Sequence, residues 1–133
     1  MGEERLKALL DTHCLIWWLA DHPSLSKRAS HTISLTSNRL YVSAASAWEI
    51  AIKVRAGKLN VPEYLLTDFS GTLEREGFDS LSMTISHAVH AGELPGEHHD
   101  PFDRMLIAQA HIESMAIIGK DKIFDNYGID RIW

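Results

Sequence analysis

Apolar positions recur along the chain in short runs, separated by longer segments of helical spacing. The short runs predict buried strands at 8–10, 40–43, 78–83, 116–118 and 129–133. The longer segments predict helices at 12–20, 26–36, 46–56, 63–76, 84–92 and from 101 onward. Strands that alternate with helices favour parallel pairing through right-handed crossovers, which cover both faces of the sheet. We therefore expect one α/β domain over residues 1–133, with a central, mostly parallel sheet flanked by helices on both faces.

The helix expected from residue 101 onward begins with two carboxylates. Asp100 is a suitable N-cap, Pro101 suits the first helical position because its missing N–H needs no partner there, and Asp103 follows one turn later. Residues 105–110 are apolar except for Gln109, so the body of this helix should be buried. This arrangement either starts an ordinary helix or holds a carboxylate rigidly at the rim of the core.

Composition and charge indicate in which compartment the protein is expected and which partners it can have. The chain has a single cysteine, so no disulfide can form within it and a reducing compartment is expected. No apolar run approaches the roughly 20 residues that span a bilayer, and the N-terminus has no signal-peptide pattern, so we expect a cytoplasmic protein without membrane contact. The net charge of −5 argues against broad coating of nucleic acid, but it is compatible with a nuclease whose acids gather around a metal ion.

Four acidic residues follow predicted strands or lie near the helix starts behind them. Asp11 ends the first strand, and Glu49 is expected in the first turn of the helix after the second. Asp103 lies in the first turn of its helix, and Asp121 follows the strand 116–118. Because functional groups of parallel sheets gather beyond the carboxyl ends of the strands, these acids are candidates for one site. Mg²⁺ and Mn²⁺ prefer such oxygen ligands, and a bound ion would activate water to hydrolyse a phosphodiester.

Each acid also has an ordinary structural alternative. Ser46 and Glu49 have the spacing of a capping box, in which the glutamate bonds the N–H of the cap residue. Asp103 could simply favour the positive end of its helix, and Asp11 and Asp121 could be turn or cap residues. Only convergence of the four side chains would distinguish a metal site from four separate local roles.

At these residues the chain resembles a known family, the PIN-domain toxins of VapC type. The resemblance runs in order from about residue 8 to the C-terminus. Its motifs are LLDTH at 9–13, SAASAWEI at 43–50, Lys53, GKL at 57–59, DPFDR at 100–104 continuing to Ala110, DKIF at 121–124, Tyr127 and the final pair at 132–133.

The resemblance implies a PIN-like fold and a Mg²⁺- or Mn²⁺-dependent endoribonuclease, a hydrolase of RNA phosphodiesters. It also implies the toxin of a type II toxin–antitoxin system, held inactive by a cognate antitoxin, and a homodimer. Asp11, Glu49 and Asp103 match the core metal-binding carboxylates, and Asp121 matches a more variable fourth catalytic acid. Asp100 belongs to the extended motif and is expected at the rim.

One departure from the family pattern leaves an alternative open. The family usually has Thr or Ser two residues before the fourth acid, where this chain has Gly119. The missing hydroxyl puts the role of Asp121 in question and supports a second hypothesis, a non-catalytic PIN-fold module that binds an antitoxin or itself. A nearby hydroxyl could come from Ser43 or Ser46, although capping is the simpler role for both.

Three residues are candidates for contact with the RNA substrate. His13 follows Asp11 and could either approach the scissile phosphate or position the loop. Arg104 could either bind a phosphate or form an exposed ion pair with Asp103, and Ser43 could supply a hydroxyl. The tryptophans at 17, 18 and 48 are better explained as core or interface residues than as platforms for bases. Trp17 and Trp18 give weak support to the implied homodimer, as candidates for apolar surface.

Overall fold

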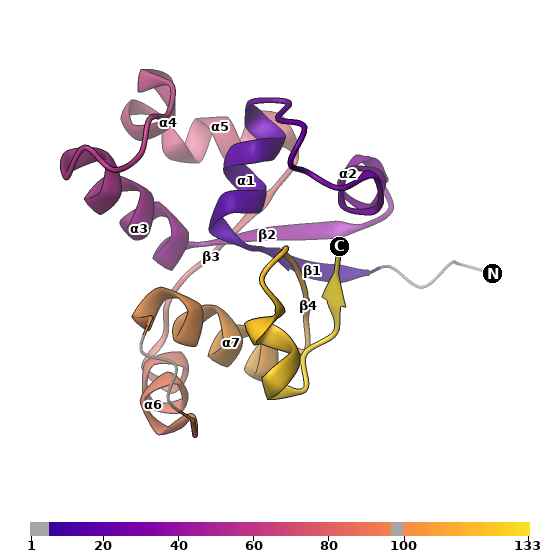
Figure 1. Ribbon diagram of the computed structural model, residues 1–133, viewed down its shortest axis with the longest axis vertical. Helices are drawn as coiled ribbons and strands as arrows, with labels where there is room; N and C mark the ends of the chain where they lie inside the picture. The colour runs from indigo at the N-terminus through magenta and orange to yellow at the C-terminus, as the bar shows by residue number, and fades with distance from the viewer. Residues whose placement is uncertain (1–5, 97–99) are drawn as a thin grey trace.

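The computed structural model describes residues 6–96 and 100–133, which form a five-stranded sheet surrounded by helices (Figure 1). The strand order is β3-β2-β1-β4-β5, and every neighbouring pair is parallel. The strands are β1 (Lys7–Leu10), β2 (Arg39–Ser43), β3 (Asp79–Leu81), β4 (Ala116–Ile118) and β5 (Arg131–Ile132). The expected parallel sheet is therefore confirmed, with the third and fifth strands shorter than predicted.

The α-helices lie in the segments where helical spacing predicted them, whereas the 3₁₀-helix that follows β4 was not predicted. They are α1 (Thr12–Leu19), α2 (Lys27–Ser34), α3 (Ala44–Arg55), α4 (Glu63–Thr67), α5 (Phe69–Glu76), α6 (Ile85–Glu93), α7 (Pro101–Glu113) and a 3₁₀-helix, η1 (Lys122–Tyr127). The single helix predicted at 63–76 is wrong, because Asp68 leaves the helical conformation and its carboxylate accepts from the N–H of Gly71 to begin α5. Within the described ranges, no helix has both the length and the apolar character needed to cross a membrane.

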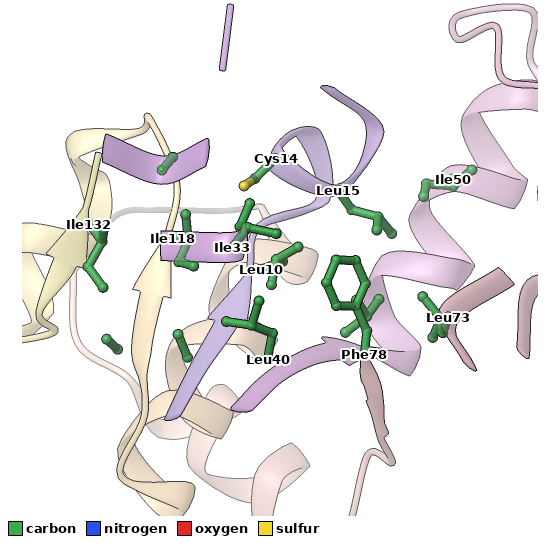
Figure 2. Close-up of a cluster of buried hydrophobic side chains, with 14 of the residues drawn as sticks. Leu10, Cys14, Leu15, Ile33, Leu40, Ile50, Leu73, Phe78, Ile118 and Ile132 are labelled. Atoms are coloured by element: carbon green, nitrogen blue, oxygen red, sulfur yellow. The ribbon is translucent and has the colours of Figure 1, made fainter. Parts of the chain in front are cut away.

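The alternation of side chains in the two central strands divides the core between the faces of the sheet. Leu10 and Ile118 join the cluster that α1, α2, α3 and α5 cover (Figure 2), whereas Leu9 and Ile117 face α7 and η1. Figure 1 shows α1 to α5 on one side of the sheet and α6, α7 and η1 on the other. Both faces of the sheet are covered, as predicted.

The topology brings three chain segments to one edge of the sheet. β1 lies between β2 and β4, so residues that follow these strands emerge side by side at their carboxyl ends. The N–H of Asp11, directly after β1, donates to the carbonyl of Ile118 at 2.9 Å and so ties the two exits together. Functional groups of parallel α/β proteins are expected at this edge.

Candidate functional site

A pocket of about 590 Å³ lies at the carboxyl edge of the sheet, and carboxylates dominate its lining. The structure brings together all four acids that the sequence singled out, together with Asp100 at the start of α7. The acidic residues of the lining are Asp11, Glu49, Asp100, Asp103 and Asp121. Convergence of these side chains from separate segments is the observation that local capping alone does not explain.

Asp11 and Glu49 are both buried at the pocket, and the charge state of Asp11 is strongly disturbed there. Asp11 is the N-cap of α1, its Oδ1 accepts from the N–H of Thr12 at 2.8 Å, and only 8% of the residue is exposed. Burial raises the pKa of Asp11 from 3.8 to about 7, with further increases from the charges of Asp103, Glu49 and Asp121. The Thr12 amide opposes this rise. Asp11 therefore lies in surroundings with a surplus of negative charge.

Glu49 reaches the pocket from the second turn of α3 rather than from its first. The predicted capping box from Ser46 to Glu49 is wrong, because α3 begins at Ala44 and Ser43 caps it by accepting from the N–H of Ala45 at 3.0 Å. Ser46 lies inside the helix, where its hydroxyl accepts from that of Thr12 at 2.9 Å. This bond fastens α3 to α1, the helix that Asp11 caps.

A lysine one turn further along α3 supplies positive charge to the pocket. The Nζ of Lys53 donates to Oε2 of Glu49 at 2.5 Å, and Glu49 is nearly buried with its side chain 6% exposed. The hydrogen bond to Glu49 raises the pKa of Lys53, and the charges of Glu49, Asp100 and Asp103 add to the effect. Lys53 thus acts as the local counter-ion of the carboxylates.

The start of α7 is as the sequence predicted. Asp100 is the N-cap, its Oδ1 accepts from the N–H groups of Phe102 at 2.8 Å and Asp103 at 3.1 Å, and Pro101 is the first helical residue. One carboxylate therefore organises the helix start at the rim of the pocket. The other, that of Asp103, lies close enough to Asp11 for its charge to raise the Asp11 pKa.

The absence of a side chain at Gly119 has a structural explanation that the sequence did not reveal. A Cβ at this position would lie 2.9 Å from the Cβ and 3.3 Å from Oδ2 of Asp11, which is too close without a shift of the aspartate. The glycine therefore allows Asp11 to pack against the end of β4. Asp121, two residues later, caps η1 by accepting from the N–H of Ile123 at 3.0 Å, and its exposed side chain lines the pocket.

The chemistry of the pocket suits a divalent cation, although its side chains do not already form a coordination site. In the part of the chain that the structure describes, no three His, Cys, Asp or Glu side chains are arranged to hold a metal ion. Oε2 of Glu49 is engaged by Lys53, so coordination through this oxygen requires the pair to separate. Clustered carboxylate oxygens, one of them with a strongly raised pKa, are nevertheless the donors that Mg²⁺ and Mn²⁺ prefer. We conclude that the donor set fits such an ion.

Only one of the three predicted substrate contacts lies at the pocket. His13 is exposed and lines it, whereas Ser43 is buried in its capping role. Arg104 donates to the carbonyls of Ala91 at 3.1 Å and Leu94 at 2.6 Å, and these bonds hold the end of α6 against α7. The structure thus gives Arg104 and Ser43 positions suited to support rather than to substrate contact.

Three further pocket residues were not among the predicted substrate contacts. Lys120 and Lys122 flank Asp121, and both are exposed beside the carboxylates. Trp17, which the sequence favoured as core or interface, lines the pocket one helical turn after His13. The spacing of residues 13 and 17 on one helix was the signal that could have identified this pair.

Comparisons with known proteins agree with this geometry. The PIN domain family matches residues 8–130. Ribonuclease VapC16 of Mycobacterium tuberculosis is 37% identical over 73 residues, and this match spans about half of each chain, 52% in both cases. Ribonuclease VapC22 of the same organism is 30% identical over 115 residues, 86% of each chain.

Solved structures share the fold. VapBC2 from Rickettsia felis, bound to a DNA fragment from its promoter, aligns with a TM-score of 0.70 at 14% identity, covering 96% of this chain and 100% of that one. A toxin–antitoxin complex from Klebsiella pneumoniae aligns with a TM-score of 0.60 at 16% identity, covering 87% and 88%. At these identities the alignments establish a common architecture.

Proposed function

Because this chain belongs to the PIN domain family, we propose that it is a metal-dependent endoribonuclease, the toxin of a toxin–antitoxin pair. The observation that carries the proposal is the pocket where Asp11, Glu49, Asp103 and Asp121 converge around a buried carboxylate of raised pKa. Such crowding of like charge costs stability, and it is typical of sites that bind cations or move protons. The ribonuclease relatives support RNA as the substrate, and an RNA substrate in turn favours a cytoplasmic place of action.

Asp11, Glu49 and Asp103 would hold Mg²⁺ or Mn²⁺ in this pocket. An ion bound there supplies a water of lowered pKa and positive charge for the reacting phosphodiester. The protein contributes position: the Thr12 amide orients the Asp11 carboxylate, and the cap at Asp100 fixes the helix that carries Asp103. Lys53, once separated from Glu49, remains available to balance the charge of a phosphate.

Purified protein tests this function when it is incubated with single-stranded and structured RNAs in Mn²⁺ or in EDTA. We expect cleavage in Mn²⁺ and none in EDTA, because in the proposed mechanism the attacking water is activated only when a metal ion is bound to the carboxylates. Calorimetric titration with Mn²⁺ should show saturable binding. Cleavage that survives EDTA would contradict the metal mechanism, whereas absence of both binding and cleavage would favour the non-catalytic module.

An antitoxin partner is part of the proposal, and its support is the fold shared with the Klebsiella pneumoniae toxin–antitoxin complex. Inhibition would follow if the partner covered the pocket or entered it. A bound segment that carries a basic side chain could pair with the same carboxylates that Lys53 now partly balances. Such a partner would compete with the metal ion, with RNA, or with both.

For the implied homodimer we propose a different surface from the one that the sequence suggested. Trp18 packs against Phe78 beside the core, which leaves less of its ring for such a contact. On α6, Ile85 and Val89 are 85% and 53% exposed and lie one turn apart. Nearby, Trp48, Met83 and Phe102 line a cavity of about 230 Å³ that α6 also borders. We propose that a second copy covers this face. About a twofold axis, the exposed α6 side chains of each copy can enter the cavity of the other, so the face can be self-complementary.

Replacement of both α6 residues tests the dimer. The double variant Ile85→Glu, Val89→Glu should raise the dimer dissociation constant by about a hundredfold or more, since a twofold axis would bring like charges together. Sedimentation velocity over a concentration series measures the change. Leu35→Glu, at an exposed apolar residue after α2, is the matched control. A monomeric wild-type protein, or an undisturbed dimer in the double variant, would rule out this surface.

A further inference from the structure

Trp17 is held in an unusual way for a large apolar side chain. Among the described residues, it is absent from both apolar clusters of the core, yet it lines the acidic pocket. Its ring contacts are with other rings: His13 at a centroid distance of 5.7 Å, His22 at 5.9 Å and Trp133 at 5.8 Å. A tryptophan that packs on rings at the border of a pocket presents a flat, preformed aromatic surface there.

The rings behind Trp17 are themselves fixed. His22 stacks on Trp17 at an interplanar angle of 23°. Its ring Nδ1 accepts from the backbone N–H of Ser24, and its backbone N–H donates to the Trp17 carbonyl. Trp133 is packed against the apolar core and meets Trp17 at 53°. His13 lies on the pocket side, exposed and tilted by 43° to Trp17. These four rings therefore form a continuous cluster, which is anchored in the core at Trp133 and reaches the pocket at His13.

Positive charge accompanies these rings. Lys120, between β4 and η1, and Lys122, the first residue of η1, line the same pocket. Flat rings next to lysines are the combination by which proteins bind single-stranded nucleic acid, since bases stack on the rings and phosphates pair with the cations. A protein segment offers no bases to stack on the rings and no phosphates to pair with the lysines, so RNA suits this combination better.

We infer that His13 and Trp17 form a stacking subsite for an unpaired nucleobase of the RNA, with Lys120 and Lys122 contacting its backbone phosphates. This inference rests on the proposed function and adds a substrate class to it. A base within a duplex is already stacked and paired, so the subsite selects single-stranded segments such as loops and ends. It gives His13 contact with a base, whereas the sequence suggested contact with the scissile phosphate.

Binding of a short single-stranded RNA that carries 2-aminopurine tests the subsite. Ca²⁺ replaces Mn²⁺ in the binding measurements, and a gel verifies that the RNA stays intact. Wild-type protein should quench the 2-aminopurine emission and bind a matched duplex at least about tenfold more weakly. His13→Ala and Trp17→Leu should each weaken binding of the single strand by about tenfold or more and reduce the quenching, while Trp17→Tyr should retain both.

Two comparisons separate stacking from charge and from misfolding. His13→Ala should leave the slope of log Kd against log salt unchanged, whereas Lys120→Ala combined with Lys122→Ala should reduce it. Tyr64→Leu removes an exposed aromatic ring outside the pocket and should bind RNA as the wild type does. Because His13 is exposed, its variant reports on the subsite even where Trp17→Leu fails to fold.

The outcomes distinguish this inference from the proposed function. Unchanged RNA binding and quenching in His13→Ala, and in Trp17→Leu where that variant folds, with Mn²⁺-dependent cleavage intact, would overturn the subsite and leave the function standing. In that case, loss of antitoxin binding in His13→Ala would assign the rings to the protein partner. Ring-dependent RNA binding without cleavage in Mn²⁺ would support the subsite and overturn the nuclease.

Discussion

Asp103→Asn should lower the rate of RNA cleavage in Mn²⁺ by about a thousandfold or more. The loss follows because charge stabilisation by a bound metal ion contributes several kcal/mol to such reactions, and the amide is a poorer ligand than the carboxylate. Asp103 shares the pocket with Asp11 and Glu49, and its charge acts on Asp11 directly. Single-turnover cleavage of a fluorescent RNA measures the rate.

Asp100→Asn is the matched control for this experiment. Asparagine caps a helix about as well as aspartate, and its side-chain oxygen can still accept from the N–H groups of Phe102 and Asp103. The start of α7 should therefore persist, and the rate should fall by less than about tenfold. Equal losses in the two variants would mean that the rim carboxylate is also a metal ligand. An unchanged rate in Asp103→Asn would contradict the proposed site.

The position of the site followed from the sequence because parallel sheets restrict where strand ends can lie. Short apolar runs located the strands before Asp11 and Asp121, and alternation with helices implied parallel pairing. The carboxyl ends then had to share one edge. The start of α7 was equally predictable, since Asp100 and Pro101 act through their own backbone and nearest neighbours.

Features that depend on distant partners could not be predicted in the same way. Ser43 and Ser46 are both good caps by type, and the structure resolves the choice because the Ser46 hydroxyl pairs with Thr12, which is 34 residues away in the sequence. Arg104 stands beside a catalytic candidate in the sequence, yet its guanidinium meets the carbonyls at the end of α6. Sequence patterns report local preferences, whereas these contacts are set by tertiary packing.

Gly119 shows how a departure from a family pattern can be compensated in three dimensions. The sequence presented it as a lost hydroxyl, which favoured a weakened site. In the structure, the missing side chain leaves the space in which Asp11 packs, so a larger residue on this backbone would displace a metal-binding candidate. The glycine is thus compatible with an active pocket, and it removes part of the support for the non-catalytic alternative.

Asp11→Asn should stabilise the protein at pH 8 in EDTA while it abolishes the proposed catalysis. The pKa of Asp11 is about 7 in the folded chain against 3.8 for an unperturbed side chain, so the ionised form destabilises the fold. The difference is about three pKa units at about 1.4 kcal/mol each, so the gain is at most about 4 kcal/mol, with a rise in Tm on the order of 10 °C. The Asn side chain can still accept from the Thr12 N–H. Thermal unfolding followed by circular dichroism measures the difference.

The pH dependence of this gain identifies its origin. Because the folded-state pKa is raised, the contribution of the Asp11 carboxyl to stability is complete below about pH 4 and is lost progressively as the pH rises through about 7. The two proteins should therefore unfold at similar temperatures near pH 4, and the advantage of Asp11→Asn should grow to a plateau above pH 7. Mn²⁺ should raise the Tm of the wild type more than that of the variant, since only the carboxylate gains a strong ligand bond. A variant less stable than the wild type at pH 8 in EDTA would show that the pocket does not store this electrostatic strain, and that Asp11 is held for the stability of the fold.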